Sequence, residues 1–310
     1  MTAAPTPRAL SDASGRRRIL GEIVLVLGLS LGASAVYSLV SIIARVTSEV
    51  ALGDQVTVLN PSRSPRPWLD LTHQLLSIGF TLVPVLLAVY LLAIRPCRAP
   101  VGEAIGWDWH RRRNGPWRNG PWRGEVVPAG GRPGATRIRA TLPAAGRRRR
   151  DILWGLALAA AVGLPGLAFY AVGRFLGITV AIQASALDNH WWTVPVLVLS
   201  AIRHGLIEEV IVVAYLYERT RDLGWSAAGR ADWRFVAVTA VFRGSYHLYQ
   251  GFGPFIGNVA MGVLFAWWFT SRWGRHRVMP LVVAHALINT VAFVGYPLMP
   301  ESWRLALGFS

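Results

Sequence analysis

Two adjacent glutamates, Glu208 and Glu209, lie in the middle of an apolar stretch at 193–217. Acidic side chains at bilayer depth cost about 2.5–3.5 kcal/mol each on insertion scales, so they usually face a bundle interior or a wet cavity and mark a functional site. His204 precedes Glu208 by four residues, which places this histidine and this carboxylate on one helix face. The pattern predicts that one of the glutamates acts as a general base in a buried site.

Two more pairs of polar residues, each with a spacing of four, follow in later apolar stretches. Arg243 and His247 share one helix face, and His285 and Asn289 share another. His285 and Asn289 can both donate hydrogen bonds to one small group. Each pair also has a structural interpretation: His247 as an interfacial residue among aromatic side chains, and the last pair as a polar contact between helices.

The glutamates have a structural interpretation as well. In that interpretation Arg203 or Arg243 neutralises the carboxylates and fixes the helices against one another. We prefer the functional interpretation, because an ionisable residue inside a membrane is a functional hypothesis by default.

The composition places these residues in a membrane protein. Hydrophobic residues make up 53% of the 310 and charged residues only 15%. Apolar runs of about 20 residues recur, which is the length at which a helix crosses a bilayer. We therefore expect an all-α fold, a polytopic transmembrane helical bundle with about seven spans. The expected spans are 19–44, 74–94, 152–178, 193–217, 235–249, 255–269 and 278–294.

The basic residues predict how the spans are oriented. All 32 are arginines, and they gather before the first expected span and after the second, fourth and sixth. Because arginine-rich connections stay in the cytoplasm, we expect the N-terminus to be cytoplasmic. The exclusive use of arginine suggests a high-GC genome, so we expect the plasma membrane of a bacterial cell. The net charge of +16 does not indicate nucleic-acid binding, since the arginines border apolar spans, where the lipid bilayer is their partner.

The chain divides into five parts, of which the fourth contains all of these motifs. The parts are an N-terminal cytoplasmic tail (1–18), the first two transmembrane helices (19–95), a cytoplasmic loop rich in Arg, Pro and Gly (96–150), a second membrane bundle (151–297) and a short C-terminal tail (298–310).

The long loop contains the tandem repeat Arg-Asn-Gly-Pro-Trp at 113–117 and 118–122. Its composition is typical either of a solvated linker or of an Arg/Trp segment lying on the cytoplasmic leaflet. The lone Cys97 excludes an intrachain disulfide and a Cys-based metal cluster. The N-terminal region has the outline of a signal peptide, but its apolar run continues too far, so we expect a retained span.

In their order and spacing, the double Glu, Arg243-x-x-x-His247 and His285-x-x-x-Asn289 resemble the CAAX protease and bacteriocin-processing family of intramembrane endopeptidases, also called the CPBP or Abi family. That family has a double Glu followed by an Arg, then Phe-x-x-x-His, then His-x-x-x-Asn or Asp, on successive membrane helices. The resemblance covers about 202–289 and implies an all-helical bundle around a wet cavity.

The resemblance also implies an activity, the hydrolysis of a membrane-proximal peptide bond in a peptide or membrane-protein substrate, and makes 151–297 the catalytic bundle. It implies a role for each matching residue. Glu208 would activate water with Glu209 beside it, His247 would help to hold the water, and His285 and Asn289 would stabilise the oxyanion. The supporting residues would be Arg243 and His204.

Two positions depart from the family pattern. Val213 stands where the family has Arg, and Arg243 stands where it has Phe. We hypothesise that the two changes compensate, so that the glutamates keep a nearby guanidinium that comes from a different helix.

A catalytic metal is left open by the sequence. Glu208, His247 and His285 are the candidate ligands for a Zn²⁺, which commonly has three protein ligands and an open position for water. Spacing across separate helices does not establish a coordination geometry. The rival classes are a non-catalytic membrane scaffold or immunity-type protein, which should tolerate the loss of the motif residues, and a proton-coupled carrier, which the lack of a repeat relating the two halves of the chain disfavours.

Overall fold

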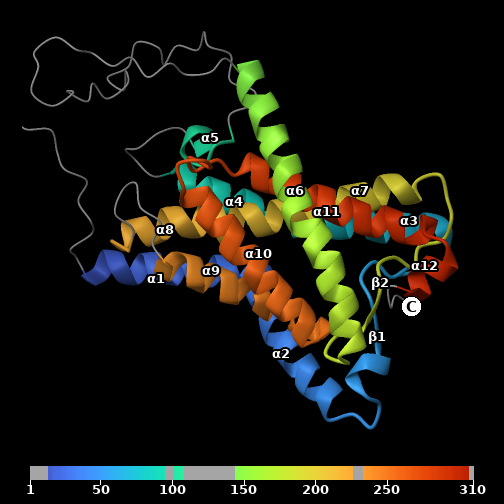
Figure 1. Cartoon of the computed structure of the whole chain (residues 1–310). Coiled ribbons are helices and arrows are strands. Elements are labelled where there is room, and N and C mark those ends of the chain that lie inside the picture. The colour runs from blue at the N-terminus through green and yellow to red at the C-terminus, as the bar shows by residue number, and fades with distance from the viewer. Residues whose placement is uncertain (1–12, 95–100, 108–143, 226–232, 307–310) are drawn as a thin grey trace, which may run out of the picture.

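The computed structural model describes residues 13–94, 101–107, 144–225 and 233–306. The Arg/Trp repeat and most of the long loop fall outside these ranges. The described chain is helical almost throughout and forms a bundle of long helices (Figure 1). The expected all-α membrane bundle is confirmed.

The first half of the chain forms three long apolar helices. The first is a continuous run of α1 (Ala13–Leu27), the π-helical segment η1 (Gly28–Gly32) and α2 (Ala33–Val46). The second consists of α3 (Pro67–Thr81) and α4 (Val83–Ala93), and the third is α6 (Ala144–Phe175), which follows the short α5 (Val101–Ala104). Many large apolar side chains on these helices are exposed, as expected where a helix faces lipid.

The second half forms the helices that contain the motifs. One continuous helix combines α7 (Thr193–Leu206), the π-helical η4 (Ile207–Tyr215) and α8 (Leu216–Asp222). It is followed by α9 (Trp233–Ser245), the 3-10 turn η5 (Leu248–Gln250), α10 (Phe252–Thr270), α11 (Met279–Leu298) and the short α12 (Glu301–Ala306). Every residue of η4 is buried, so this segment forms the centre of the bundle.

Five helices in the described ranges are long and apolar enough to cross a membrane, so the expected count of about seven is not confirmed. The helix containing α7 and η4 does not qualify because it has Arg203, Glu208 and Glu209 in its middle. Helix α9 has 13 residues, about 20 Å at 1.5 Å per residue, which is too short for a hydrocarbon core of about 30 Å.

Two glycines allow the helices around the motifs to pack closely. A Cβ atom at Gly205 on α7 would lie 3.0 Å from the Val282 carbonyl oxygen of α11. A Cβ atom at Gly262 on α10 would lie 2.7 Å from the Ala240 Cα atom of α9. Helix α7 therefore packs closely against α11, and α10 packs closely against α9.

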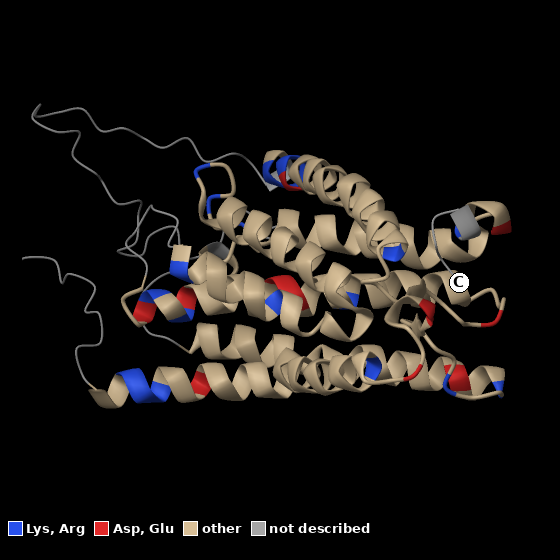
Figure 2. Cartoon of the chain, turned by 60° about the horizontal axis from the view of Figure 1, so that its bottom comes forward, with Lys and Arg blue, Asp and Glu red and all other residues tan. Residues whose placement is uncertain are grey.

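The two ends of the bundle have different contacts. At one end, Arg219 of α8 forms an ion pair with Glu22 of α1, and Arg277 forms an ion pair with Asp151 of α6 at 2.5 Å. Figure 2 shows that charged residues lie mainly toward the ends of the bundle and that few lie in its middle.

At the other end, β1 (Val56–Val58) pairs in parallel with β2 (Ala181–Gln183), with Val56 opposite Ala181. The Val180 N–H donates to the Gln250 carbonyl at 3.1 Å, which ties this small sheet to the turn after α9. Two strands of three residues do not change the fold class. They fix the position of the polypeptide that follows the second motif.

Candidate active site

The glutamate pair lies at the start of the π-helical segment η4. Glu208 is 3% exposed and Glu209 is fully buried. A π-helical stretch inside an α-helix is rare and is frequently found at functional sites. Both adjacent carboxylates lie inside the bundle. The sequence predicted the helix and the buried carboxylates but not the π-helical geometry.

Arg243 of α9 neutralises the pair. One guanidinium nitrogen, Nη2, donates to Glu209 Oε1 at 2.7 Å, and Nη1 lies 3.4 Å from Glu208 Oε2. The guanidinium carbon also lies 5.5 Å from the centre of the Phe265 ring, within the range of a cation–π contact. Arg243 is fully buried. Of the two arginines considered from the sequence, Arg243 therefore contacts the carboxylates, whereas Arg203 has no ion pair with them.

Tyr246 is the member of this cluster to which sequence reasoning gave no role. Its phenol donates to Glu208 Oε2 at 2.8 Å, and its side chain is buried. Its position next to His247 in the second motif was the one sequence feature that could have indicated a role. The direction of the chain after α9 was needed to show that its hydroxyl reaches Glu208. Oε2 of Glu208 thus accepts from both Tyr246 and Arg243, and no described residue donates to Oε1.

Two histidines face Glu208 from different elements. His247 Nε2 lies 3.8 Å from Glu208 Oε2, and His285 Nε2 of α11 lies 3.8 Å from Glu208 Oε1. These distances are too long for direct hydrogen bonds. The His247 side chain is 20% exposed, the most exposed in the cluster, and its Nε2 has no hydrogen-bond partner among the described residues.

The second motif differs in shape from the expectation. The fifth span was expected to continue to residue 249, but α9 ends at Ser245, so Tyr246 and His247 lie in the turn that follows. Gly251 closes this turn with φ at 107°, and a Cβ atom there would lie 2.6 Å from the Ile178 carbonyl oxygen. The turn docks on the segment before β2, and this contact sets where His247 lies.

His285 and Glu209 form an oriented pair. His285 Nδ1 lies 2.7 Å from Glu209 Oε1, so a proton on Nδ1 is donated to this carboxylate. Nε2 of the same ring then faces Glu208. A carboxylate behind a histidine fixes its ring and tautomer and stabilises its protonated form, as in the acid–base pairs of hydrolases.

Two predicted residues do not join the cluster. Asn289 lies one turn after His285 on α11 and is half-buried, and no hydrogen bond connects it to the cluster within the described part of the chain. His204 donates from Nδ1 to the Ser200 carbonyl at 2.8 Å, and its Nε2 lies 2.9 Å from Arg203 Nη2. His204 and Glu208 lie on the same helix face, as expected, but no hydrogen bond joins their side chains in the described part of the chain.

The candidate zinc ligands do not form a metal site in this arrangement. Among the described residues, no group of three His, Cys, Asp or Glu side chains is placed to bind a metal ion. The Arg243 guanidinium already contacts Glu208 and Glu209, and Nδ1 of His285 is engaged with Glu209. A divalent cation would have to share these carboxylates with a buried positive charge.

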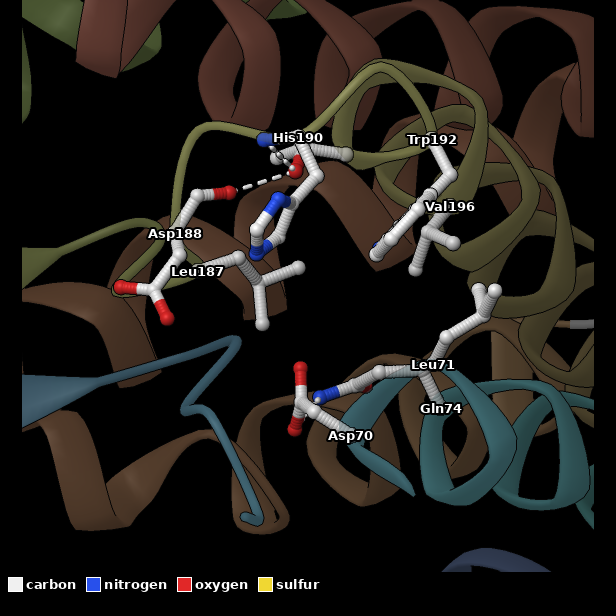
Figure 3. A pocket seen from close by; sticks show the side chains of 9 residues that line it. Asp70, Leu71, Gln74, Leu187, Asp188, His190, Trp192 and Val196 are labelled. Atoms are coloured by element: carbon white, nitrogen blue, oxygen red, sulfur yellow. Dashed lines mark hydrogen bonds between the residues drawn. The ribbon is translucent and has the colours of Figure 1, made fainter. Parts of the chain in front are cut away.

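A separate small pocket lies between α3 and α7, away from the cluster (Figure 3). Its volume is about 10 Å³, room for one water molecule. Asp70 and Gln74 line one side, and Asp188, His190 and Trp192 line the other. It contains none of the residues that the sequence singled out.

The described chain is an all-helical membrane protein in which a carboxylate pair of η4, an arginine of α9, a histidine of the following turn and a histidine of α11 meet in a buried acid–base cluster. Residues 190–291, about a third of the chain, match the family model described as Type II CAAX prenyl endopeptidase Rce1-like. The matched region contains the whole cluster, and the resemblance to the CAAX protease family is confirmed for it. A search of the curated proteins and a search of the solved structures each gave no match.

Proposed function

We propose that the protein is an intramembrane endopeptidase that hydrolyses a membrane-proximal peptide bond with a water molecule activated by Glu208. The observation that carries the proposal is the position of Glu208, whose two oxygens each lie 3.8 Å from the Nε2 atom of a different histidine. A water molecule held between these atoms contacts a base and a proton carrier at once. The Rce1-like match supports the reaction class.

In this proposal Oε1 of Glu208 is the base. Tyr246 and Arg243 hold Oε2, so Oε1 is left to accept a proton from water while the water oxygen attacks the peptide carbonyl carbon. His285, oriented by Glu209 behind it, is placed to face the negative charge that develops on the carbonyl oxygen. When the C–N bond breaks, the proton on Glu208 passes to the leaving amine.

The remaining residues have positioning roles. Arg243 keeps two adjacent buried carboxylates together by supplying the opposite charge. His247, the most exposed member, lies where water and substrate approach. Asn289 stays a candidate oxyanion donor that would require substrate binding to draw it into the site. No step requires a metal.

The test is hydrolysis of a quenched peptide library by the purified protein in detergent, compared with Glu208→Gln and His285→Ala. We expect both variants to keep the thermal stability of a folded protein and to lose cleavage by at least about 100-fold, as is usual when a catalytic acid–base group is removed. Cleavage by a folded Glu208→Gln variant at the wild-type rate would refute Glu208 as the base, and the absence of cleavage by the folded wild type would favour a non-catalytic scaffold. Measuring cleavage with and without a chelator tests whether activity requires a metal ion.

We further propose that the protein lies in a bacterial plasma membrane with its N-terminus in the cytoplasm, because the arginine-rich connections gather on one side of the expected spans. The single Cys97 offers a direct test in spheroplasts. A membrane-impermeant maleimide should label it only after the membrane is opened, and labelling of intact spheroplasts would contradict this orientation.

A further inference from the structure

Three arginines from two distant segments meet at the end of the bundle where α6 begins. Arg150 of α6 donates from Nη2 to the Trp273 carbonyl oxygen at 2.8 Å, in the turn between α10 and α11. The Arg272 guanidinium carbon lies 4.9 Å from the centre of the Trp273 ring. Arg275 donates from Nε to the Arg272 carbonyl oxygen at 3.4 Å and is close enough to Arg150 to repel it electrostatically. Together, Arg150, Arg272, Arg275 and Trp273 form a basic patch.

The arginines of the basic patch have no carboxylate of their own. Among the described residues, no Asp or Glu forms an ion pair with any of the three. Asp151 acts on Arg150 electrostatically, but Arg277 binds both of its oxygens, Nε to Oδ1 at 2.7 Å and Nη2 to Oδ2 at 2.5 Å. The Asp151 side chain is only 1% exposed. Cations that converge in this way create a positive potential at the surface, which favours an anion.

The turn between α10 and α11 holds its arginines in fixed places. The Arg275 N–H donates to the Ser271 carbonyl oxygen at 3.0 Å. A Cβ atom at Gly274 would collide with the Trp268 carbonyl oxygen, so the turn lies tightly against the end of α10. Arg272 and Arg275 are nevertheless exposed. Guanidinium groups on a fixed backbone bind an anion at a lower entropic cost than groups on a loose loop.

Exposed apolar side chains continue from the basic patch along α6. Leu153 follows Arg150 by three residues and Trp154 follows it by four, so both lie on the helix face of Arg150. The Trp154 and Trp273 ring centres are 6.1 Å apart, and Leu153 and Leu156 are 53% and 47% exposed. Cations and tryptophans above an apolar helix face match a phospholipid, which has an anionic headgroup above its hydrocarbon chains. A soluble anion has no use for the apolar surface.

We propose that the basic patch binds the phosphodiester headgroup of an anionic phospholipid, whose acyl chains lie along the exposed side chains of α6. Arg272 and Arg275 hold the phosphate oxygens with charge-assisted hydrogen bonds, for which the planar guanidinium is well suited. Arg150 adds positive charge from the helix side. Arginine-rich connections attract anionic lipid in general without a defined site, whereas this patch is fixed in place by two segments. The inference does not depend on the peptidase function.

The experiment measures lipid binding to the purified full chain by native mass spectrometry. Phosphatidylglycerol is compared with phosphatidylcholine of the same acyl chains. We expect the first phosphatidylglycerol to bind about 10-fold more tightly, the size of a hydrogen bond to a charged group. Phosphatidylglycerol should also raise the unfolding temperature in detergent more than phosphatidylcholine does, because it binds the folded state. Equal affinities for the two lipids would overturn the inference.

Matched variants separate a defined site from general attraction. Arg272→Gln/Arg275→Gln should lose the preference for phosphatidylglycerol, and Arg272→Lys/Arg275→Lys should keep part of it because the charges remain. Arg16→Gln/Arg17→Gln removes the same two charges from exposed positions of α1 and should keep the preference. If the two Gln pairs weaken phosphatidylglycerol binding equally, the lipid is attracted by the basic surface as a whole and the site does not exist.

Inorganic phosphate distinguishes a lipid from a soluble anion. We expect millimolar phosphate neither to displace phosphatidylglycerol nor to raise the unfolding temperature as the lipid does, because phosphate does not contact the apolar face of α6. Phosphate that displaces the lipid and stabilises the protein equally well would assign the basic patch to a soluble phosphate group and refute the lipid site.

Discussion

Replacing Arg243 with Phe tests whether one buried cation holds the site together. The substitution restores the residue type that the related family has at this position, but it leaves Glu208 and Glu209 adjacent, buried and without their guanidinium. Removal of one partner from a buried ion pair costs about 3–5 kcal/mol because the other charge stays uncompensated. We therefore expect Arg243→Phe to lower the unfolding free energy by about that amount and to abolish cleavage.

A second substitution, Val213→Arg, tests whether a guanidinium from η4 can replace the one from α9. Val213, where the family has Arg, lies in η4 four residues after Glu209 and is 1% exposed. In the double variant Arg243→Phe/Val213→Arg, the new guanidinium approaches the same carboxylates from η4. We expect a favourable coupling of about 1–3 kcal/mol between the two substitutions and a partial return of activity.

The assay is a double-mutant cycle of thermal unfolding in detergent, followed by circular dichroism, with peptide cleavage measured on the same samples. Arg66→Phe is the matched control, because Arg66 is exposed at the start of α3 and its loss should change stability by less than about 0.5 kcal/mol. If Arg243→Phe is as stable as the wild type, or if the double variant folds without any coupling, Arg243 is not the counter-charge that holds the two glutamates.

Two further predictions concern Tyr246 and His276. Tyr246→Phe removes the hydrogen bond to Glu208 Oε2 and should lower the unfolding free energy by about 1.5–3 kcal/mol, as for a hydrogen bond to a charged group; a change below about 0.5 kcal/mol in chemical denaturation would contradict this role. Burial, with a smaller contribution from Arg221, lowers the pKa of His276 from 6.5 to about 4, and its Nε2 lies 2.7 Å from the Tyr217 hydroxyl. Below pH 6.5 the unfolded chain therefore binds a proton at this histidine, whereas the folded chain binds it only near pH 4. The unfolding free energy should be independent of this group above pH 7 and should fall by up to about 3 kcal/mol between pH 6.5 and 4. In His276→Phe, the unfolding free energy measured across this range should depend less steeply on pH. An unchanged pH dependence would assign it to other groups.

Much of the site could be predicted because it depends on local periodicity. Glu208, His247 and His285 lie in apolar stretches at helical spacings, and their types restrict the chemistry to acid–base work. The exchange of Val213 and Arg243 against the family pattern also pointed to a relocated cation. The distances of Arg243 to both glutamates agree with that hypothesis.

Other features depend on contacts between segments that are distant in sequence. The end of α9 at Ser245 follows from the turn at Gly251, which docks on the residues before β2. That turn directs Tyr246 to Glu208, and no spacing rule relates a turn residue to a partner 38 positions earlier. The π-helical geometry of η4 likewise cannot be predicted from a 3.6-residue periodicity.

The fold class, the buried carboxylates and the residue types of the cluster could be predicted from the chain alone, since helix formation and lipid burial follow from runs of apolar residues and the cost of charges among them. The packing of the helices was needed to show that Arg243 contacts the glutamates and that His204 lies against Arg203. It also placed Glu209 behind His285. The physical reason is that a helix fixes the face on which a side chain lies, whereas the packing of helices against one another fixes which faces meet.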